Sequence, residues 1–311
     1  MPSPVSLGAA SASVLAFDVG GSFIKAALVD TNGDVRGSRS VATPLHPTQP
    51  AETILDRIGE LARELQAEHP HAGVQAAGLT VPGIVDAATG TGIYSANLGW
   101  RDFPFTTQAQ SRLGMPVAFG HDVAAAGAAE LQMRQTHDHH DAAVLIIGTG
   151  IAAAVFSGDK PVTAGGYAGE IGHALVPAPS GGTTILEALG SAGAITHRYT
   201  AISGNTVDGA KAVLSLAAEG DPIARQVWEQ AVDALAFSIS QCVSILGTEV
   251  FVIGGGLSQA GEALLVPLRK AVYELLTFHR RPRILPATLG QDAGLIGAAL
   301  YARAILVTGS S

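Results

Sequence analysis

The chain has 311 residues and a formal net charge of −8. Nucleic acids and anionic membranes are bound by clustered basic side chains, so this acidic balance argues against both as partners. Charged residues make up 14% of the chain, hydrophobic residues make up 47%, and 38 residues are glycine. With this length, the composition predicts a folded protein of about two domains.

The apolar runs are too short to cross a membrane. Residues 144–147 and 250–253 have the length of strands and stop at glycines, whereas a membrane-spanning helix needs about 20 apolar residues. Residues 1–13 contain no Lys or Arg and no sustained apolar run, which does not fit a signal peptide. Cys242 is the only cysteine, which excludes an intramolecular disulfide and a Cys-rich zinc site. We expect a cytoplasmic protein.

The first predicted elements are two strands joined by a glycine turn. Residues 14–17 are apolar and lead into the turn 18–22, a second apolar run covers 23–29, and a polar turn follows at 30–34. The same order of strand, glycine turn, strand and polar turn recurs over 144–159. We interpret this recurrence as an internal duplication that produces two similar halves.

Helices separate the strands. Apolar residues recur at steps of three and four over 51–67, which predicts one amphipathic helix. Asp221 and Pro222 are typical of an N-cap and a first helical turn, and the apolar pattern continues to about residue 246. A strand follows at 249–253, and Ser258 is expected to be the N-cap of the next helix.

This alternation of strands and helices predicts an α/β fold with buried sheets. We place the domain boundary near Gly120. Residues 1–120 would form a small N-terminal domain, completed by the C-terminal segment 293–311, and residues 121–292 would form a larger domain.

Three glycine turns follow predicted strands, at 20–22, 148–150 and 254–256. A turn without Cβ atoms lets several backbone N–H groups converge on one oxyanion, while a plain hairpin turn is the alternative for each. Together the three favour a nucleotide or phosphate ligand. The Walker pattern is absent, which argues against a P-loop enzyme. Gly254, Gly256 and Gly261 match the Rossmann fingerprint only in part, because the third glycine is at the wrong spacing. A dehydrogenase is therefore only the second interpretation.

Several polar residues stand where strands end. Asp18 lies beside the first glycine turn, where a carboxylate can hold a metal-bound water near a triphosphate or accept hydrogen bonds from the turn. Asp122 stands between a predicted strand and a helix, as a residue presented to a cleft or as an N-cap. Glu170 and His173 lie three residues apart. They could form part of a functional site, or they could belong to a turn that is closed by its own hydrogen bonds. The His/Asp run 137–141 fits an exposed loop better than a metal site.

This ordered set of motifs resembles the ROK family of sugar kinases and repressors. The segments that carry the resemblance are Asp18–Lys25, Gly148–Gly150, Glu170–His173, Leu186–Glu187, Gly254–Gly256 and the C-terminal run from Gly290 to Ala299. They span nearly the whole chain. The resemblance implies a two-domain actin/hexokinase-like (ribonuclease H-like) α/β fold with a central cleft, and a homodimer.

The resemblance also assigns roles. Asp122 would be the catalytic base, and Asp18 would hold Mg²⁺ through a water molecule. The residues expected to contact the phosphates and the adenosine side of ATP are Asp18, Gly20, Gly21, Ser22, Lys25, Gly148, Thr149, Gly150, Gly254, Gly255 and Gly256. The residues expected to contact the sugar are Asn97, His121, Asp122, Glu170, His173 and Glu187. Such a polar ring suits a polyol, because a hydroxyl buried without a partner costs about 1–3 kcal/mol.

The sequence departs from the family pattern in two places. Many members carry a Cys-rich zinc knuckle after the histidine, but residues 177–186 contain no cysteine, so we expect no zinc there. His121 occupies the position where the family usually has Asn before the catalytic Asp. A histidine can change between donor and acceptor roles, which leaves the hexose open.

The resemblance implies an ATP- and Mg²⁺-dependent hexose kinase that phosphorylates the 6-hydroxyl of glucose. The alternatives are a polyphosphate-dependent glucokinase or mannokinase, an N-acetylmannosamine kinase and a non-catalytic sugar-binding regulator. The family's repressors carry an N-terminal helix-turn-helix, and residues 1–13 are too few for one.

Overall fold

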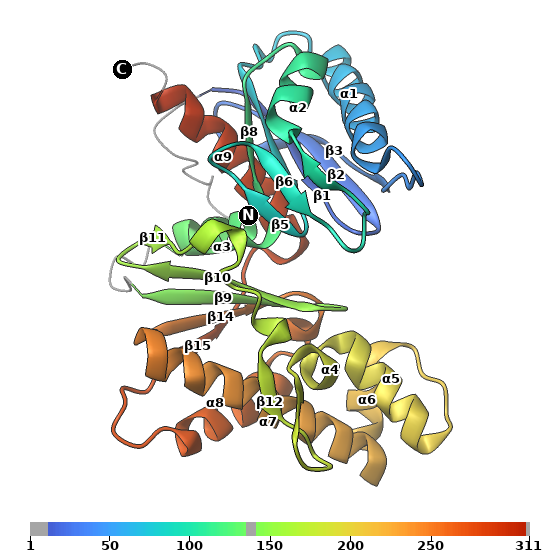
Figure 1. Cartoon of the computed structure of the whole chain (residues 1–311), viewed down its shortest axis with the longest axis vertical. Helices are drawn as coiled ribbons and strands as arrows, with labels where there is room; N and C mark the ends of the chain where they lie inside the picture. The colour runs from blue at the N-terminus through green and yellow to red at the C-terminus, as the bar shows by residue number, and fades with distance from the viewer. Residues whose placement is uncertain (1–11, 135–140, 309–311) are drawn as a thin grey trace. The chain divides into compact units, whose positions relative to one another are not determined.

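The computed structural model describes residues 12–134 and 141–308 (Figure 1). The described residues divide into two compact units. Unit 1 contains 12–134, 164–167 and 291–308, and unit 2 contains 141–163 and 168–290. The boundary near Gly120 therefore differs from the observed division. The helix α3 (Asp122–Met133) stays in unit 1 because it packs along α9 (Ala293–Thr308), which also belongs to unit 1.

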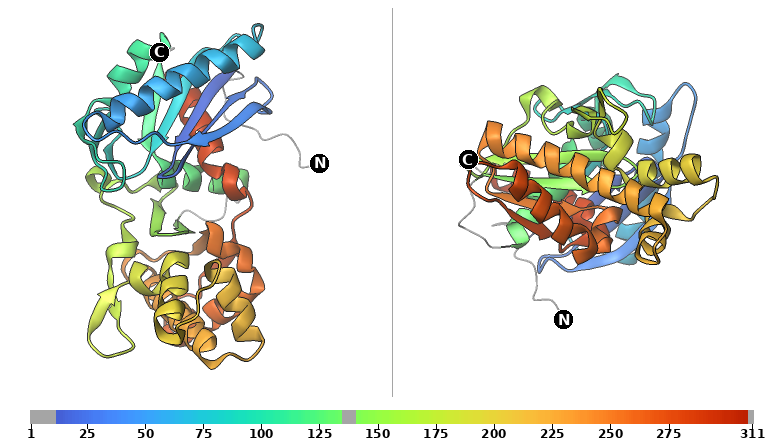
Figure 2. Two further views of the ribbon diagram at one scale, coloured as in Figure 1. Left: turned by 90° about the vertical axis from the view of Figure 1, so that its right-hand side faces the viewer. Right: turned by 90° about the horizontal axis from the view of Figure 1, so that it is seen from below.

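Unit 1 is built on a five-stranded sheet with the order β3-β2-β1-β4-β8. Its strands are β1 (Val14–Val19), β2 (Phe23–Val29), β3 (Val35–Ala42), β4 (Ala76–Val81) and β8 (Val117–His121). The strands β1, β2 and β3 are antiparallel neighbours, while β4 and β8 run parallel to β1. The helices α1 (Pro50–Glu68) and α2 (Phe105–Leu113) lie on one face and α9 lies on the other (Figures 1 and 2).

Side chains alternate between the two faces of this sheet, as the pleat requires. Leu15, Phe17 and Val19 of β1 join the apolar core under α1, so Asp18 faces α9. The α9 face carries small residues: a Cβ on Gly78 would lie 1.8 Å from the carbonyl oxygen of Ala298. The missing side chains let α9 lie directly on the strands.

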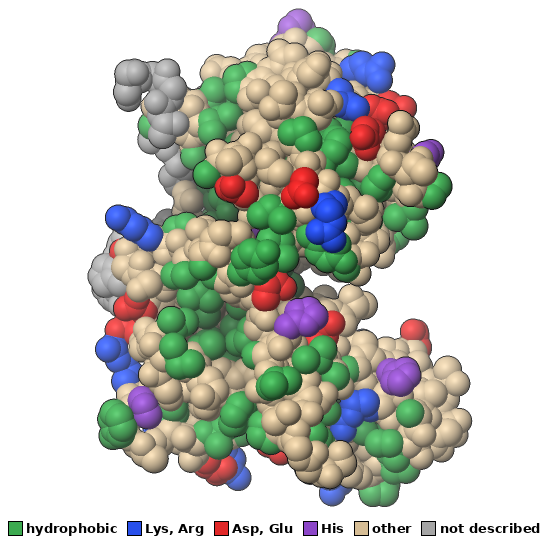
Figure 3. Space-filling model, in the orientation of Figure 1, with side chains coloured by type: hydrophobic (Ala, Val, Ile, Leu, Met, Phe, Trp, Pro, Cys, Tyr) green, Lys and Arg blue, Asp and Glu red, His purple; other side chains and the backbone are tan. Residues whose placement is uncertain are grey.

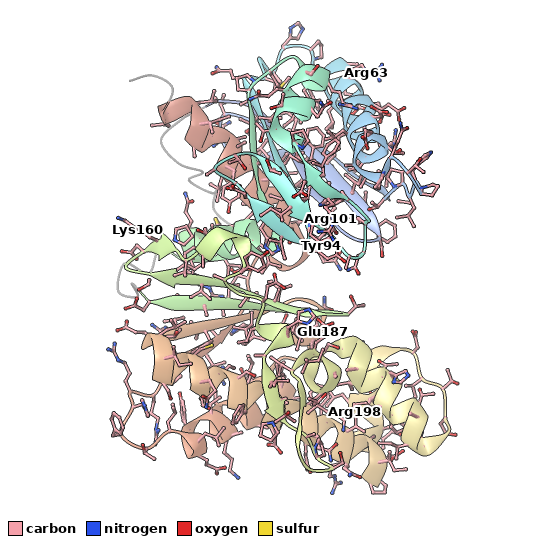
Figure 4. All side chains as sticks on the ribbon, in the orientation of Figure 1. Arg63, Tyr94, Arg101, Lys160, Glu187 and Arg198 are labelled. Carbon is pink, nitrogen blue, oxygen red and sulfur yellow. The ribbon has the colours of Figure 1, made fainter. Side chains whose placement is uncertain are left out.

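A smaller three-stranded sheet completes unit 1. Its strands are β5 (Ile84–Asp86), β6 (Thr91–Tyr94) and β7 (Arg101–Phe103). The guanidinium of Arg101 lies 4.8 Å from the ring centroid of Tyr94 (labelled in Figure 4), a cation–π contact between neighbouring strands.

Unit 2 repeats the plan of unit 1. Its main sheet has the order β11-β10-β9-β14-β15. The strands are β9 (Ala142–Ile147), β10 (Ile151–Ser157), β11 (Lys160–Pro161), β14 (Val250–Gly254) and β15 (Arg283–Pro286). Again three antiparallel neighbours are followed by two strands parallel to the first. The shared topology is what an internal duplication predicts.

A hairpin and several helices complete unit 2 and share one apolar core with its sheet. They are the hairpin β12 (Leu175–Pro177) and β13 (Thr183–Ile185), and the helices α4 (Glu187–Gly190), α5 (Ala192–Ser203), α6 (Gly209–Ala218), α7 (Pro222–Leu246) and α8 (Glu262–Leu275). The N-terminus of α7 is where the sequence predicts it, because Oδ1 of Asp221 accepts hydrogen bonds from the N–H groups of Ile223 and Ala224.

The expected N-cap at Ser258 is wrong. Ser258 lies inside a 3₁₀ turn, Gly256–Ala260, and α8 begins only at Glu262. The hydroxyl of Ser258 donates to the carbonyl of Gly255 at 2.7 Å instead of capping a helix. The side chain thus closes the glycine turn.

No helix in the described part of the chain has the length and apolar character needed to cross a membrane. Acidic and basic side chains are interspersed on the face shown in Figure 3, and this face carries no continuous basic patch. The His/Asp run of the sequence lies largely at 137–140, outside the described residues.

Candidate active site

Asp18 lies near the end of β1, against the first turn of α9. A Cβ on Gly294 would lie 2.3 Å from Oδ2 of Asp18, so only glycine fits at this position of the helix. The hydroxyl of Thr80 donates to Oδ1 of Asp18 at 2.9 Å. The parallel register of β1 and β4 pairs these two residues and places their side chains on the same face.

Burial, and then the negative charge of Asp122, raises the pKa of Asp18 to about 6. The hydrogen bond from Thr80 and the charge of Lys25 oppose this rise. Lys25 is the partner of Asp18 in the β1–β2 register, and its Nζ donates to the carbonyl of Gln291, just before α9. The ionised form of Asp18 is thus destabilised by its surroundings, and a nearby cation would stabilise it.

The glycine turn 20–22 is fixed mainly by hydrogen bonds that its carbonyl groups accept. The N–H of Gly20 donates to the carbonyl of Phe23 at 2.8 Å, and Thr43 binds the carbonyls of Gly20 and Ser22 through its hydroxyl and its N–H. In the described residues, nothing accepts a hydrogen bond from the N–H of Gly21 or Ser22. Both residues are exposed, so these two donors are available to an anion.

Asp122 is the first residue of α3, and its neighbour His121 is the N-cap. The imidazole Nδ1 of His121 accepts from the N–H of Ala124 at 3.3 Å. Oδ1 of Asp122 accepts from the N–H of Val123 at 2.7 Å and lies 3.4 Å from Nε2 of His121. The side chain of Asp122 is 24% exposed, and the described residues offer no donor to its Oδ2. Asp122 is therefore not the N-cap that the sequence allowed as an alternative.

In unit 2, the turn 148–150 lies beside Glu187 (labelled in Figure 4). Oε2 of Glu187 accepts from the N–H of Ile151 at 2.9 Å, and a Cβ on Gly150 would lie 2.7 Å from the same oxygen. The turn is tied to the start of α5 because the N–H of Ala192 donates to the carbonyl of Gly148 at 2.8 Å. Within the described chain, the N–H groups of Thr149 and Gly150 have no acceptor.

The segment 170–173 joins the same group. A Cβ on Gly172 would lie 3.2 Å from Oε2 of Glu187, so Glu170 and His173 flank a glycine that touches this carboxylate. The N–H of His173 donates to the carbonyl of Glu170 at 3.1 Å, which forms a 3₁₀ turn, and the His173 side chain is exposed. The structure thus brings three of the predicted sugar residues together in unit 2.

Asn97 lies in unit 1, in an exposed turn after β6. The turn is closed by Ser95, whose carbonyl accepts from the N–H of Gly99 at 2.9 Å. The expected contact of Asn97 with the sugar therefore rests on the family resemblance alone.

In the third glycine turn, 254–256, close packing leaves no room for a side chain at two of the three positions. A Cβ on Gly255, whose φ is +79°, would lie 2.4 Å from the carbonyl oxygen of Ile147, and a Cβ on Gly254 would lie 2.8 Å from Cδ1 of Ile146. Gly256 has open space around it. Because β9 and β14 are parallel, the turns 148–150 and 254–256 lie at the same edge of the unit 2 sheet.

Sequence reasoning missed three residues that build these sites: Thr80, Thr43 and Gly294. A threonine within the apolar run of β4 was an available signal for Thr80. Thr43 and Gly294 act through contacts between segments far apart in the chain; the motif run 290–299 contains Gly294 but does not show its contact with Asp18. The described residues hold no group of three or more His, Cys, Asp or Glu arranged for a metal ion.

Comparisons with known proteins fit this architecture. Solved structures that match over nearly the whole chain include a hexokinase and a glucokinase. The ROK hexokinase from Thermus thermophilus has a TM-score of 0.80 and 28% identity, covering 96% of this chain and 100% of its own. A ROK family glucokinase from Streptomyces griseus, solved with glucose and AMPPNP, has a TM-score of 0.77 and 27% identity, covering 94% and 99%. The fold is the two-domain actin/hexokinase-like α/β fold.

Relatives at the level of sequence include a glucokinase and an N-acetylmannosamine kinase. The glucokinase of Halalkalibacterium halodurans is 30% identical over 304 residues, which cover 90% of this chain and 92% of that protein. The N-acetylmannosamine kinase of Shigella flexneri is 30% identical over 299 residues, which cover 94% and 98%. Residues 14–305 match the ROK family, and the chain belongs to this family.

Proposed function

We propose that this protein is a sugar kinase that transfers the γ-phosphoryl group of ATP to the 6-hydroxyl of a hexose, with glucose as the first candidate. The observation that carries the proposal is the carboxylate pair of unit 1. Asp122 stands at the start of α3 and acts electrostatically on the buried Asp18, beside a glycine turn with free N–H groups. Glucokinases among the relatives support the choice of reaction.

Asp122 is the proposed general base. Its Oδ1 is occupied by the N–H of Val123, which fixes the carboxylate and leaves Oδ2 to accept the proton of the attacking hydroxyl. It stands in the first turn of α3, where the partial positive charge of the helix N-terminus faces the carboxylate. The proton would thus move from the sugar oxygen to Oδ2 as the phosphoryl group is transferred.

The phosphate contacts are assigned to backbone donors. We propose that the free N–H groups of the turns 20–22 and 148–150 bind phosphate oxygens, with Lys25 adding positive charge in unit 1 and 254–256 serving the adenosine side. The AMPPNP bound to the Streptomyces griseus glucokinase supports ATP as the donor.

The residues of unit 1 suit Mg²⁺. This ion prefers one or two carboxylates together with water and substrate phosphates, and the mutual repulsion of Asp18 and Asp122 is what a divalent cation relieves. When bound, Mg²⁺ would neutralise charge on the phosphates. Asp18 is the residue we propose to hold it, through a water molecule.

The sugar contacts are assigned to Glu187, Glu170 and His173 in unit 2 and to Asn97 in unit 1. Carboxylates accept hydrogen bonds from hydroxyls, while imidazole and amide groups donate as well as accept, so the set can satisfy a polyol. The ring of His121 is already engaged at both nitrogens by Ala124 and Asp122, so a direct bond from His121 to the sugar stays a prediction.

The N-acetylmannosamine kinase relative favours a second candidate substrate. A coupled assay of ADP release across glucose, mannose and N-acetylmannosamine tests both, and the proposal expects kcat/KM to be highest for glucose. Replacing ATP by inorganic polyphosphate in the same assay tests the donor. Absence of turnover with every sugar and both donors would contradict the kinase and favour a non-catalytic sugar-binding regulator.

A further inference from the structure

Arg198 of unit 2 is a half-buried cation without a counter-charge. It lies on α5 (labelled in Figure 4), and its Nη2 donates to Oε1 of Gln230. Its Nη1 is buried and has no hydrogen-bond partner. No ion pair among the described residues includes Arg198, and burial lowers the pKa of its guanidinium.

Two other partly buried arginines of the described chain have a carboxylate partner. Arg112 pairs with Asp56 at 2.8 Å, and Arg269 pairs with Glu262 at 2.9 Å. A guanidinium stays protonated in proteins, so Arg198 bears the cost of desolvating its charge without the attraction that normally offsets it. A bound anion would supply the missing counter-charge.

A hollow of about 430 Å³ opens beside Arg198, a volume in the range of small-molecule sites. Its polar lining consists of Arg198, Gln226, Gln230, Ser180 and Thr184, and the rest is apolar. Amide N–H and hydroxyl groups donate hydrogen bonds to anionic oxygens, and a guanidinium presents a planar fork that matches a carboxylate. These residues come from α5, α7 and the β12–β13 hairpin.

Acidic residues near the hollow favour a singly charged anion over a doubly charged one. A neighbouring hollow of about 540 Å³ shares Gln230 with the first and contains Asp233 and Glu274. Burial, together with the charges of Glu229 and Glu274, raises the pKa of Asp233, so this side of the groove is electronegative. One positive charge facing such a field suits a singly charged anion better than a phosphate dianion.

We propose that the hollow beside Arg198 binds the carboxylate of a small organic acid whose apolar body rests on the hairpin and α4. The site uses none of the residues assigned to the kinase reaction and does not depend on that assignment.

Saturation-transfer NMR on the full chain tests the proposal, with propionate as the probe and inorganic phosphate as the second arm. We expect saturable binding of propionate, competition by lactate, and at least ~10-fold weaker binding of phosphate. Arg198→Gln should weaken propionate binding at least ~10-fold, because it removes a charge-assisted hydrogen bond. Arg225→Gln, the same charge change at an exposed position of α7, should leave binding unchanged.

A second variant keeps the test decisive if Arg198→Gln fails to fold. Gln226→Glu changes an exposed side chain and places a carboxylate in the hollow with Arg198, so it should abolish propionate binding while the protein stays folded. Equal binding in this variant, no saturable binding of either acid to the unmodified protein, or tighter binding of phosphate than of propionate would overturn the proposal.

Discussion

Nε2 of His121 lies 3.4 Å from Oδ1 of Asp122, while Nδ1 of the same ring accepts from the N–H of Ala124 at 3.3 Å. Because Nδ1 is an acceptor, the neutral imidazole carries its proton on Nε2, facing the carboxylate. One side chain thus caps α3 and orients the residue that we propose as the catalytic base. His121 thus serves as the N-cap of α3, a role that Asn, Asp and Ser take more often.

Replacing His121 separates these two roles. Asn is a good N-cap, so His121→Asn should change the free energy of unfolding by less than about 0.5 kcal/mol, whereas His121→Ala should cost about 1 kcal/mol. Urea unfolding followed by circular dichroism measures both. An Ala variant as stable as the unmodified protein would show that the bond to Ala124 contributes nothing.

Asp122→Asn tests the base directly. It should lower kcat by at least ~10²-fold and leave the KM for the sugar within a few-fold, because it removes a proton acceptor without removing volume. Steady-state kinetics and the thermal midpoint measure the effect and control for folding. Near-normal turnover would refute the role of Asp122.

We expect the ionised Asp18 to lower the stability of the protein at neutral pH while being required for activity. Its pKa of about 6 in the folded protein exceeds the ordinary value of 3.8, so the folded state holds the proton more tightly than the unfolded state. The contribution to stability is full below pH 4 and is lost as the pH rises through 6, which amounts to ~3 kcal/mol.

Asp18→Asn should therefore raise the free energy of unfolding at pH 7.5, by up to about that amount, and abolish turnover. Unfolding at pH 7.5 and at pH 4 measures the difference, which should be smaller at the lower pH. A variant that is less stable than the wild type at pH 7.5 would contradict the raised pKa.

Thr80 is expected to set the acid limit of activity. Its hydrogen bond lowers the pKa of Asp18, so Thr80→Val should raise that pKa further and move the acid limb of the kcat/KM profile to higher pH. Thr80→Ser keeps the hydroxyl and should keep the profile, which distinguishes a positioning role from a packing role. If both variants shift the limb equally, the hydroxyl is not the cause.

Two glycines of the turn 148–150 form a matched pair. A Cβ on Gly150 would displace Oε2 of Glu187 and break its bond to the N–H of Ile151, whereas a Cβ on Gly148 meets nothing within 4 Å. Gly150→Ala should cost about 1–3 kcal/mol because a buried N–H loses its acceptor. Gly148→Ala should be tolerated. Thermal unfolding of both variants tests this contrast, and equal losses would contradict it.

The elements that the sequence predicted correctly rest on local signals. The apolar run 23–29 is β2, and the Asp221–Pro222 pair starts α7 as expected. The two glycine hairpins indicated the duplication that the shared strand order displays. The N-cap at Ser258 failed because the chain first makes a 3₁₀ turn whose hydrogen bonds involve Gly255, and capping residues also favour such turns.

The sequence by itself determined the α/β class, the three glycine turns and the carboxylates beside them, because strand period, turn chemistry and helix caps act between near neighbours. Only the tertiary structure decided what each carboxylate experiences. Asp18 faces Thr80 because two parallel strands 62 residues apart share a register, and it meets α9 because Gly294 has no side chain. Burial and charge are sums over such distant contacts, so no local pattern contains them.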